Sequence, residues 1–384
     1  MALFKPATPR RPLMSYPPLN WICTAYTMSS IIVHLPLWIL SFVLVPAWRL
    51  HPEWSLKRTL LVRIGRRLLD WVGKVEAPVP LSLEPGKEKD QFVTIDPASA
   101  EHYQGPLKSH AVAPATIGGT WYPKRPGNLK SWGSHESVIL HLHGGAFIMG
   151  DGRIDMAGYC ASLLLQHAGA TAVFMPQYRL ASRPGMDPFP AAVQDCLTSY
   201  LHLTQAEGIP ARSITVSGDS AGGNLAIALV RYLAELGPAL GIAPPQSACL
   251  FSPWTNPKKS LLPASHLTSD PHHDTDILAH SILQWGAREY ARLVPASDPY
   301  ITPQDHPFAT PVPLLVNMGA TELFVDDGAE WARAMAGVEG NVVVLNIEAG
   351  APHDTLLLGS MLGCQESAER TAALVGAFIK KHQE

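Results

Sequence analysis

Apolar and polar positions follow a regular order beyond Gln91. Short runs rich in valine, isoleucine and threonine, typical of β-strands, alternate with longer stretches whose apolar residues have helical spacing. Such runs predict eight strands, which lie near Phe92, Thr116, Val173, Leu250, Val316 and Val344 or end at His143 and Gly218. The helical stretches cover residues 155–167, 191–205, 221–236 and 366–382. This order predicts an α/β fold in which helices cover both faces of a mostly parallel eight-stranded sheet.

One interval, residues 254–313, is too long for a simple connection between two strands. It contains a further helical run over residues 277–293. Long loops in compact domains commonly serve as lids or binding elements. We therefore expect this insertion to form a helical cap on the domain that extends over residues 91–384.

The amino-terminal part of the chain has a different pattern. Residues 12–48 contain no Asp, Glu, Lys or Arg, and residues 29–48 are apolar over about the length of a helix that spans a bilayer. The pattern predicts an amino-terminal arm over residues 1–28, followed by a single-pass transmembrane helix that anchors the chain. A buried helix or a lid is the alternative, because Pro36 and Pro46 interrupt the segment. A cleaved signal peptide is disfavoured, since the apolar stretch is long and starts far from residue 1.

The charges that flank this segment predict its orientation. Arg10 and Arg11 precede the segment, whereas six basic residues follow it within residues 49–67. Positively charged flanks stay on the cytosolic side of a membrane. The remainder of the chain is therefore expected on the cytosolic side of a membrane such as the endoplasmic reticulum.

The segment of residues 49–90 contains a predicted basic amphipathic helix. Between residues 55 and 75, leucine, isoleucine and valine recur at helical spacing, and most basic residues lie on other faces. Such a helix can lie on an anionic membrane surface. It can equally pack its apolar stripe on the protein as part of the cap, and both alternatives stay open.

Composition limits the possible partners. Hydrophobic residues make up 47% of the chain and charged residues 16%, with a net charge of −3. This balance gives no indication of nucleic-acid binding. The five cysteines lack metal-binding or redox spacing, so we interpret them as buried thiols without a disulfide framework. No metal or other cofactor is predicted.

The first motif that suggests catalysis is Gly218-Asp219-Ser220-Ala221-Gly222, between an apolar strand and an apolar helix. Glycines two residues before and after the serine permit a sharp turn, in which a strained residue exposes its hydroxyl at the end of the strand. The start of the helix directs N–H groups toward any oxyanion that forms nearby. A tight turn with an N-capping serine is the alternative. The strand, turn and helix together favour Ser220 as a nucleophile.

The second motif, His143-Gly144-Gly145-Ala146, follows the third predicted strand. An ester carbonyl under attack develops a negative oxygen, which needs N–H donors from such a loop. Small residues allow the backbone to approach a substrate closely. We expect Gly145, Ala146 and Ala221 to supply the donors of an oxyanion hole, with His143 as a brace; a plain glycine turn is the alternative.

Several motifs occur in one order along the chain: HLHGGAF, YRLASRPGMDPFPAAVQD, GDSAGGN, FSPWTN and DPYITP. In this order they resemble the hormone-sensitive-lipase-like group of the α/β-hydrolases, from about residue 90 to the end of the chain. The chain departs from the group where Ala146 replaces a third glycine and where residues 182–184 replace Pro-Glu-His. Alanine still supplies an N–H group. The second departure is expected to change a structural loop.

The resemblance also implies the partners of Ser220. A serine hydroxyl needs a histidine to accept its proton and an acid to orient that histidine, and in this fold they follow in the order serine, acid, histidine. Glu322 aligns with the acid, which is more often aspartate in the group, and His353 occupies the histidine position. Asp326 and Asp327 are then expected to begin a helix or lie in a loop.

These residues predict a serine carboxylesterase of the α/β-hydrolase fold. We expect it to hydrolyse short-chain acyl esters, such as acetyl esters, of a small lipophilic alcohol through an acyl-enzyme. The same residues also suit an acyltransferase, a lactonase or an amidase or formamidase, and these alternatives stay open. A ligand receptor without catalysis, which plants derived from this group by loss of the histidine, is disfavoured because His353 is present.

Overall fold

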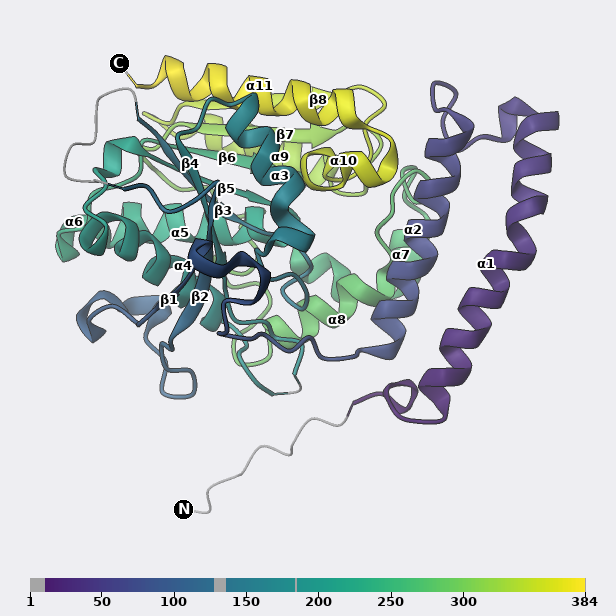
Figure 1. The fold of residues 1–384 in the computed structure, drawn as a ribbon, viewed down its shortest axis with the longest axis horizontal. Coiled ribbons are helices and arrows are strands. Elements are labelled where there is room, and N and C mark those ends of the chain that lie inside the picture. Colours follow the sequence, from purple (N-terminus) through teal and green to yellow (C-terminus); the bar gives the residue numbers. More distant parts are fainter. Residues whose placement is uncertain (1–10, 128–135, 184, 384) are drawn as a thin grey trace.

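The computed structural model describes residues 11–127, 136–183 and 185–383. These residues form an eight-stranded sheet with the order β1-β2-β4-β3-β5-β6-β7-β8 (Figure 1). The strands are β1 (Phe92–Ile95), β2 (Ile117–Tyr122), β3 (Val138–Leu142), β4 (Ala172–Gln177), β5 (Ile214–Asp219), β6 (Ser247–Phe251), β7 (Leu314–Gly319) and β8 (Val343–Glu348). β2 pairs antiparallel with β1 and β4, and all other neighbours are parallel. All eight predicted strands are therefore confirmed.

Helices cover both faces of this sheet. They are α3 (Ile154–Gln166), α4 (Ala191–Leu201), α5 (Ser220–Glu235), α6 (Gly237–Leu240), α9 (Val325–Ala336), α10 (Thr355–Leu362) and α11 (Gln365–Lys381). Side chains of α4, α5 and α9 belong to one buried apolar cluster, and side chains of α3 and α11 belong to a second. The predicted fold class is confirmed, with small shifts at the helix ends, the largest at the end of α4.

The long insertion between β6 and β7 contains α7 (Ala264–Thr268) and α8 (His280–Tyr290). α8 is shorter than the predicted run over residues 277–293. It is amphipathic, and its buried side includes Ile282, Leu283 and Trp285. This insertion packs against the amino-terminal helix α2 (Leu56–Val75) as well as against the sheet domain.

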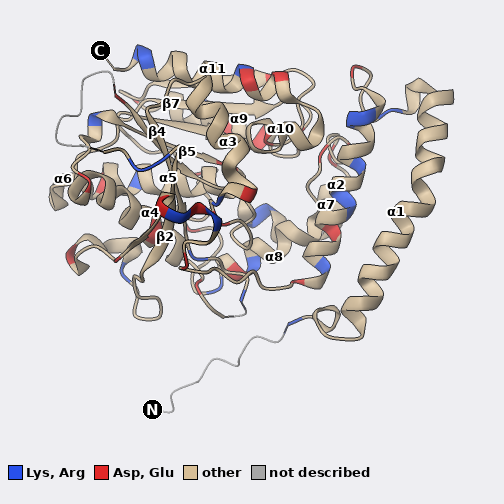
Figure 2. Cartoon of the chain, in the orientation of Figure 1, with Lys and Arg blue, Asp and Glu red and all other residues tan. Residues whose placement is uncertain are grey.

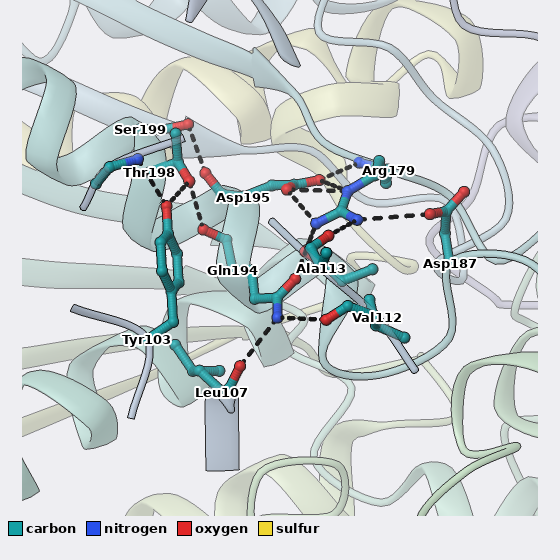
Figure 3. A network of polar contacts seen from close by, with 12 residues as sticks. Tyr103, Leu107, Val112, Ala113, Arg179, Asp187, Gln194, Asp195, Thr198 and Ser199 are labelled. Atoms are coloured by element: carbon teal, nitrogen blue, oxygen red, sulfur yellow. Dashed lines mark hydrogen bonds and ion pairs between the residues drawn. The ribbon is translucent and has the colours of Figure 1, made fainter. Parts of the chain in front are cut away.

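A buried polar network fixes the chain between β4 and α4 (Figure 3). The guanidinium of Arg179 donates to both carboxylate oxygens of Asp195, at 2.7 and 2.9 Å. The neighbouring Gln194 side chain donates to the carbonyl groups of Leu107 and Val112. These bonds hold the segment before β2 against α4, because buried backbone carbonyls need donors.

The loop after β4, which departs from the family pattern, has a structural contact of its own. The hydroxyl of Ser182 accepts a hydrogen bond from the Val79 N–H group at 3.2 Å. This bond links the loop to the segment after α2. Pro184 lies outside the described residues.

The apolar amino-terminal segment forms α1 (Leu19–Leu44), which is antiparallel to α2 and lies on the side of α2 opposite the sheet (Figure 1). The helix begins and ends earlier than the predicted segment of residues 29–48. Residues 19–28, expected in the arm, are helical, and within them the polar Thr24 hydroxyl is satisfied by the Asn20 carbonyl at 2.8 Å. Residues 1–10, including Arg10, lie outside the described part of the chain.

α1 contacts α2 along one side and exposes the other. The Arg63 guanidinium lies 5.0 Å from the ring centre of Trp38, and the Trp71 indole donates to the Thr24 hydroxyl at 3.0 Å. The opposite side exposes apolar residues that include Ile32, Leu37, Leu40 and Val43. Figure 2 shows no charged residue along α1. α1 has 26 residues, and an 18-residue window within it has a mean hydropathy of 1.8, so it is long and apolar enough to cross a membrane.

α2 packs its apolar side on the protein, as one of the two sequence-based alternatives predicted. Val62 is buried, and Gly73 lies directly against the backbone of Ser281 and Ile282 in α8. A Cβ atom at Gly73 would collide with that backbone, so the closest approach of α2 and α8 requires glycine. Gly65, elsewhere on the same helix, has ordinary contact distances to Ile277.

The substitution Gly73→Ala is expected to lower the free energy of unfolding by about 1–3 kcal/mol, because α2 must move away from α8. Gly65→Ala is the control. Its methyl group would lie 3.5 Å from the nearest Ile277 atom, and alanine favours a helix by about 1 kcal/mol over glycine. Urea unfolding of the two variants and the parent tests this. Equal stability of the two variants would contradict the close contact.

Candidate active site

Ser220 lies at the first position of α5, directly after β5. Its φ of 51° is in the left-handed region, which is strained for a serine. The flanking glycines make this turn possible, since a Cβ atom at Gly218 would meet the backbone of Gly222, and one at Gly222 would meet the Leu142 carbonyl. The sharp strand-to-helix turn expected from the glycine spacing is thus present.

Glu322 and His353 form a buried pair at the ends of neighbouring strands. Glu322 follows β7, and His353 follows β8. The Nδ1 atom of His353 lies 2.7 Å from Oε2 of Glu322, while Oε1 of the same carboxylate accepts a bond from the Gly319 N–H group at 3.0 Å. An Nδ1–H that donates to Glu322 leaves Nε2 of the neutral ring free to accept a proton.

The environment of His353 favours its charged form. Burial alone lowers the pKa of His353, but the hydrogen bond and charge of Glu322, with smaller contributions from Asp276 and Asp354, outweigh it and raise the pKa to about 9. Burial raises the pKa of Glu322, and the bond to His353 opposes that shift. The pair therefore stabilises a positive charge on the imidazole ring.

The other two acidic residues near the end of β7 have different surroundings. Asp326 and Asp327 occupy the first turn of α9, as expected from the sequence. Asp326 is exposed, and Asp327 pairs with Lys259 at 3.0 Å. The structure thus brings Glu322, and neither aspartate, to His353.

The loop after β3 has an unusual backbone. Gly145, Ala146 and Phe147 have φ values of 110°, 51° and 64°, all in the region that favours glycine. A Cβ atom at Gly145 would collide with the Met149 carbonyl. Gly286 of α8 lies against the carbonyl and methyl groups of Ala146, where any larger residue would collide. The cap therefore accommodates the alanine that stands where the family usually has a third glycine.

His143 braces this loop, as the sequence predicts. Its Nδ1 atom lies 2.8 Å from the Gly144 carbonyl, and its ring stacks on Tyr178 with 4.1 Å between the ring centres. The Tyr178 hydroxyl donates to the His143 carbonyl at 2.6 Å. Burial lowers the pKa of His143 to about 4, so the ring is neutral near pH 7.

A cavity of about 310 Å³ joins these elements. Ser220 and His353 line it together with the loop after β3, and α2, α8 and α10 supply largely apolar walls. The contributing residues are Gly65, Leu68, Leu69, His143, Gly144, Gly145, Ala146, Met149, Gly150, Asp151, Gly152, Met156, Ala157, Asp219, Ser220, Ile277, Leu278, Ile282, Leu283, His353, Asp354, Leu357, Leu358, Met361 and Leu362. Such a cavity suits an apolar ligand of small to moderate size.

Three polar residues that sequence reasoning missed support the pair. Asp276 in the cap accepts hydrogen bonds from the Leu323 and Leu278 N–H groups at 2.6 and 3.0 Å, next to Glu322. The Ser252 hydroxyl after β6 accepts a bond from the Asp354 N–H group at 3.0 Å. Asp354 follows His353 directly, which is the one signal in the sequence that could have drawn attention to it.

Thiols and metal ligands do not extend the site. The five cysteines are free; four are buried, as expected, and Cys23 on α1 is half-buried. Among the residues that the structure describes, no group of three or more His, Cys, Asp or Glu side chains is placed to hold a metal ion.

Comparison with known proteins gives the family. Residues 139–357 match the α/β hydrolase fold family, which covers more than half of the chain. The chain belongs to this family. An acetyl-hydrolase of Streptomyces hygroscopicus is 34% identical over 206 residues, which represent 52% of this chain and 60% of the relative. The match thus spans less than two thirds of that relative.

Solved structures share the fold of this α/β-hydrolase. An esterase/lipase from an uncultured bacterium aligns with a TM-score of 0.61 and 22% identity, over 86% of this chain and 99% of the other. A hormone-sensitive lipase from a metagenome library aligns with a TM-score of 0.55 and 24% identity, over 69% and 82% of the two chains. The two structures confirm the predicted fold, and the family match confirms the resemblance to the α/β-hydrolases.

Replacement of Glu322 by glutamine is expected to destabilise this α/β-hydrolase in a pH-dependent manner. Because the folded-state pKa of His353 is raised, the stabilisation by the ion pair is present below the ordinary histidine pKa and is lost as the pH rises through about 9. E322Q should therefore lose about 3 kcal/mol near pH ~6 and less near pH ~10. Chemical unfolding at both pH values measures this.

Asp326→Asn is the matched control for E322Q. Asp326 is exposed on α9, so its change should stay within about 0.5 kcal/mol at either pH. A pH-independent loss in E322Q would mean that the buried pair is not charged.

Proposed function

We propose that this α/β-hydrolase is a serine carboxylesterase in which Ser220 is the nucleophile, His353 the general base and Glu322 the residue that orients His353. The observation that carries the proposal is the buried His353–Glu322 bond of 2.7 Å, at the edge of the cavity that Ser220 also lines. A serine on a strained turn, a histidine with a free Nε2 and a buried acid are the groups that acyl transfer requires.

The backbone near Ser220 supports the proposed oxyanion hole. Ala221 occupies the second position of α5, where N–H groups have no partner in the preceding turn and the helix dipole is positive. Gly145 and Ala146 lie on the loop across the cavity. We assign the N–H groups of these three residues to the carbonyl oxygen of the substrate, whose negative charge grows during attack.

The reaction follows from these roles. Ser220 attacks the ester carbonyl as its proton moves to Nε2 of His353, and the imidazolium is stabilised by Glu322. The oxyanion collapses, the alcohol leaves with the proton from His353, and Ser220 carries the acyl group. Water then gives a proton to His353 as it attacks the acyl-enzyme, and His353 returns this proton to Ser220 as the acid leaves.

The cavity and the comparisons support a lipophilic substrate. Apolar side chains of α2, α8 and α10 dominate the walls around Ser220, so the cavity favours apolar over charged groups. The Streptomyces relative is named an acetyl-hydrolase. We therefore propose a short-chain acyl ester, such as an acetyl ester, of a lipophilic alcohol or metabolite as the substrate.

We further propose that α1 anchors the enzyme to a membrane as a single-pass helix, with the hydrolase domain on the cytosolic side. The exposed apolar side of α1 and the basic residues that follow it support this placement. Arg63 and Arg67 of α2 lie over Trp38 in the second half of α1. Since guanidinium groups are costly at bilayer depth, α1 must part from α2 when it spans the membrane.

Replacement of the nucleophile gives the most direct test of the reaction. Ser220→Ala is expected to lower kcat for p-nitrophenyl butyrate by about 10⁴-fold or more, because no other group replaces the hydroxyl. Ser265→Ala, at an exposed serine of the cap, is the control and should hydrolyse the ester at the parent rate. Unchanged hydrolysis by S220A would reject the proposed nucleophile.

The membrane anchor is tested by charges on the exposed side of α1. The double variant Leu37→Lys, Leu40→Lys changes residues that are 57% and 55% exposed on the side of α1 that would face lipid. Two lysines at bilayer depth cost about 5 kcal/mol or more, and the protein should move from the membrane to the soluble fraction. Leu83→Lys, Val342→Lys adds two lysines at exposed sites of the hydrolase domain and should stay with the membrane.

A further inference from the structure

Two buried carboxyl groups lie beside the proposed nucleophile and base. Asp219 directly precedes Ser220, and Asp354 directly follows His353. Both side chains are almost fully buried, and they lie within hydrogen-bonding distance of each other. The reaction described above uses neither of them.

The partners of Asp219 are unevenly distributed between its two oxygens. Oδ1 lies 3.0 Å from Nε2 of His141, and Nδ1 of His141 lies 2.7 Å from the Ser217 hydroxyl. Burial lowers the pKa of His141 to about 4, so this histidine is neutral and has one N–H group. The Ser217 hydroxyl then donates to Nδ1 of His141, and the Nε2–H group of His141 donates to Oδ1 of Asp219.

The second oxygen of Asp219 lacks a geometrically well-formed hydrogen bond. Oδ2 is buried and has no such partner in the described part of the chain, although it lies against the backbone of Gly144. A buried carboxylate oxygen without a donor is costly. Besides the backbone N–H group of Gly144, the Asp354 carboxyl is the neighbouring group that can donate to this carboxylate when it carries a proton.

We propose that Asp219 and Asp354 share one proton, and that the resulting carboxyl–carboxylate hydrogen bond is a positioning element that fixes Ser220 relative to His353. The bond joins the residue before the nucleophile to the residue after the base, so it spans the gap between the two turns. This inference rests on the proposed function of Ser220 and His353.

The charges around the pair agree with a single negative charge. Burial raises the pKa of both carboxyl groups, that of Asp219 to about 6 and that of Asp354 well above its usual range, so Asp354 is the member of the pair that holds the shared proton more strongly. The other titratable groups that face the pair are His141 from β3, Cys160 from α3, Tyr178 after β4 and His353. His141, Cys160 and Tyr178 add no charge near pH 7, because burial keeps all three neutral.

The neutral state of Asp354 also matters for His353. An ionised Asp354 contributes to the raised pKa of His353, so a protonated Asp354 keeps that pKa lower. Because Ser220 can give its proton only to the neutral imidazole, the lower pKa favours the reaction. The shared proton thus links the turns of Ser220 and His353 without a second negative charge beside the imidazole.

The test compares Asp354→Asn with Asp354→Ala in the full chain. Asparagine keeps a donor for Asp219 without a titratable proton and keeps the acceptor that caps α10 at the Leu357 N–H group, whereas alanine removes both the link and the cap. D354A should lose about 100-fold in kcat for p-nitrophenyl butyrate with little change in KM, as expected for misplacement by about 1 Å. D354N should recover at least about tenfold of that loss. A D354N enzyme as slow as D354A would overturn the proposal.

The pH profile separates a shared proton from a purely structural role. If Asp354 is protonated, D354N leaves the local charge unchanged, and the acid limb of kcat/KM keeps its midpoint. If Asp354 is ionised in the parent, D354N removes a negative charge near His353 and shifts that limb to lower pH, which would overturn the proposal. This comparison does not need D354A, whose folding is checked by thermal unfolding.

Infrared spectroscopy tests the proton without reference to activity. The parent and S220A should show the C=O stretching band of a buried carboxylic acid near pH 7, and D354N should lack it. Absence of the band in the parent would refute the shared proton. If S220A retained esterase activity, the proposed nucleophile would fail, but the infrared comparison would still decide whether Asp219 and Asp354 share a proton.

Discussion

The turn after β5 and the loop after β3 lie in close contact at two glycines, Gly222 and Gly144. A Cβ atom at Gly222 would overlap the Leu142 and His143 carbonyl groups, and one at Gly144 would overlap Asp219. This steric constraint allows Ser220 to adopt its positive φ and brings the N–H groups of the loop into the same cavity. The position of every other group in the site is set relative to these two strand ends.

Much of this arrangement follows from sequence. The alternation of apolar runs and helices predicts the sheet because parallel strands need helical connections. Gly218 and Gly222 predict the strained turn because only a sharp turn requires glycine on both sides of the serine. Glu322 and His353 are found through the family order, and their mutual bond agrees with it.

Other features depend on tertiary contacts that a linear pattern does not encode. The roles of Asp276 and Asp354 arise where the cap and the turn after β8 approach buried residues far away in the chain. The early start of α1 differs from the segment expected from apolar length alone, because polar residues such as Thr24 find partners within the helix and on Trp71 of α2. Likewise, Ala146 after β3 contacts Gly286 of α8, although the two residues lie far apart in the chain.

The contact between Gly286 and Ala146 has an evolutionary consequence. Caps are the part of such enzymes that can change most freely to admit new substrates, since the sheet domain folds around its own core. Here the cap helix α8 touches the loop that supplies two of the proposed oxyanion donors, at a point where only glycine fits. A cap exchanged between relatives therefore has to bring its own glycine, because a Cβ atom there would meet the backbone carbonyl of the loop whatever side chain the loop carries, so the two segments have to diversify as a unit.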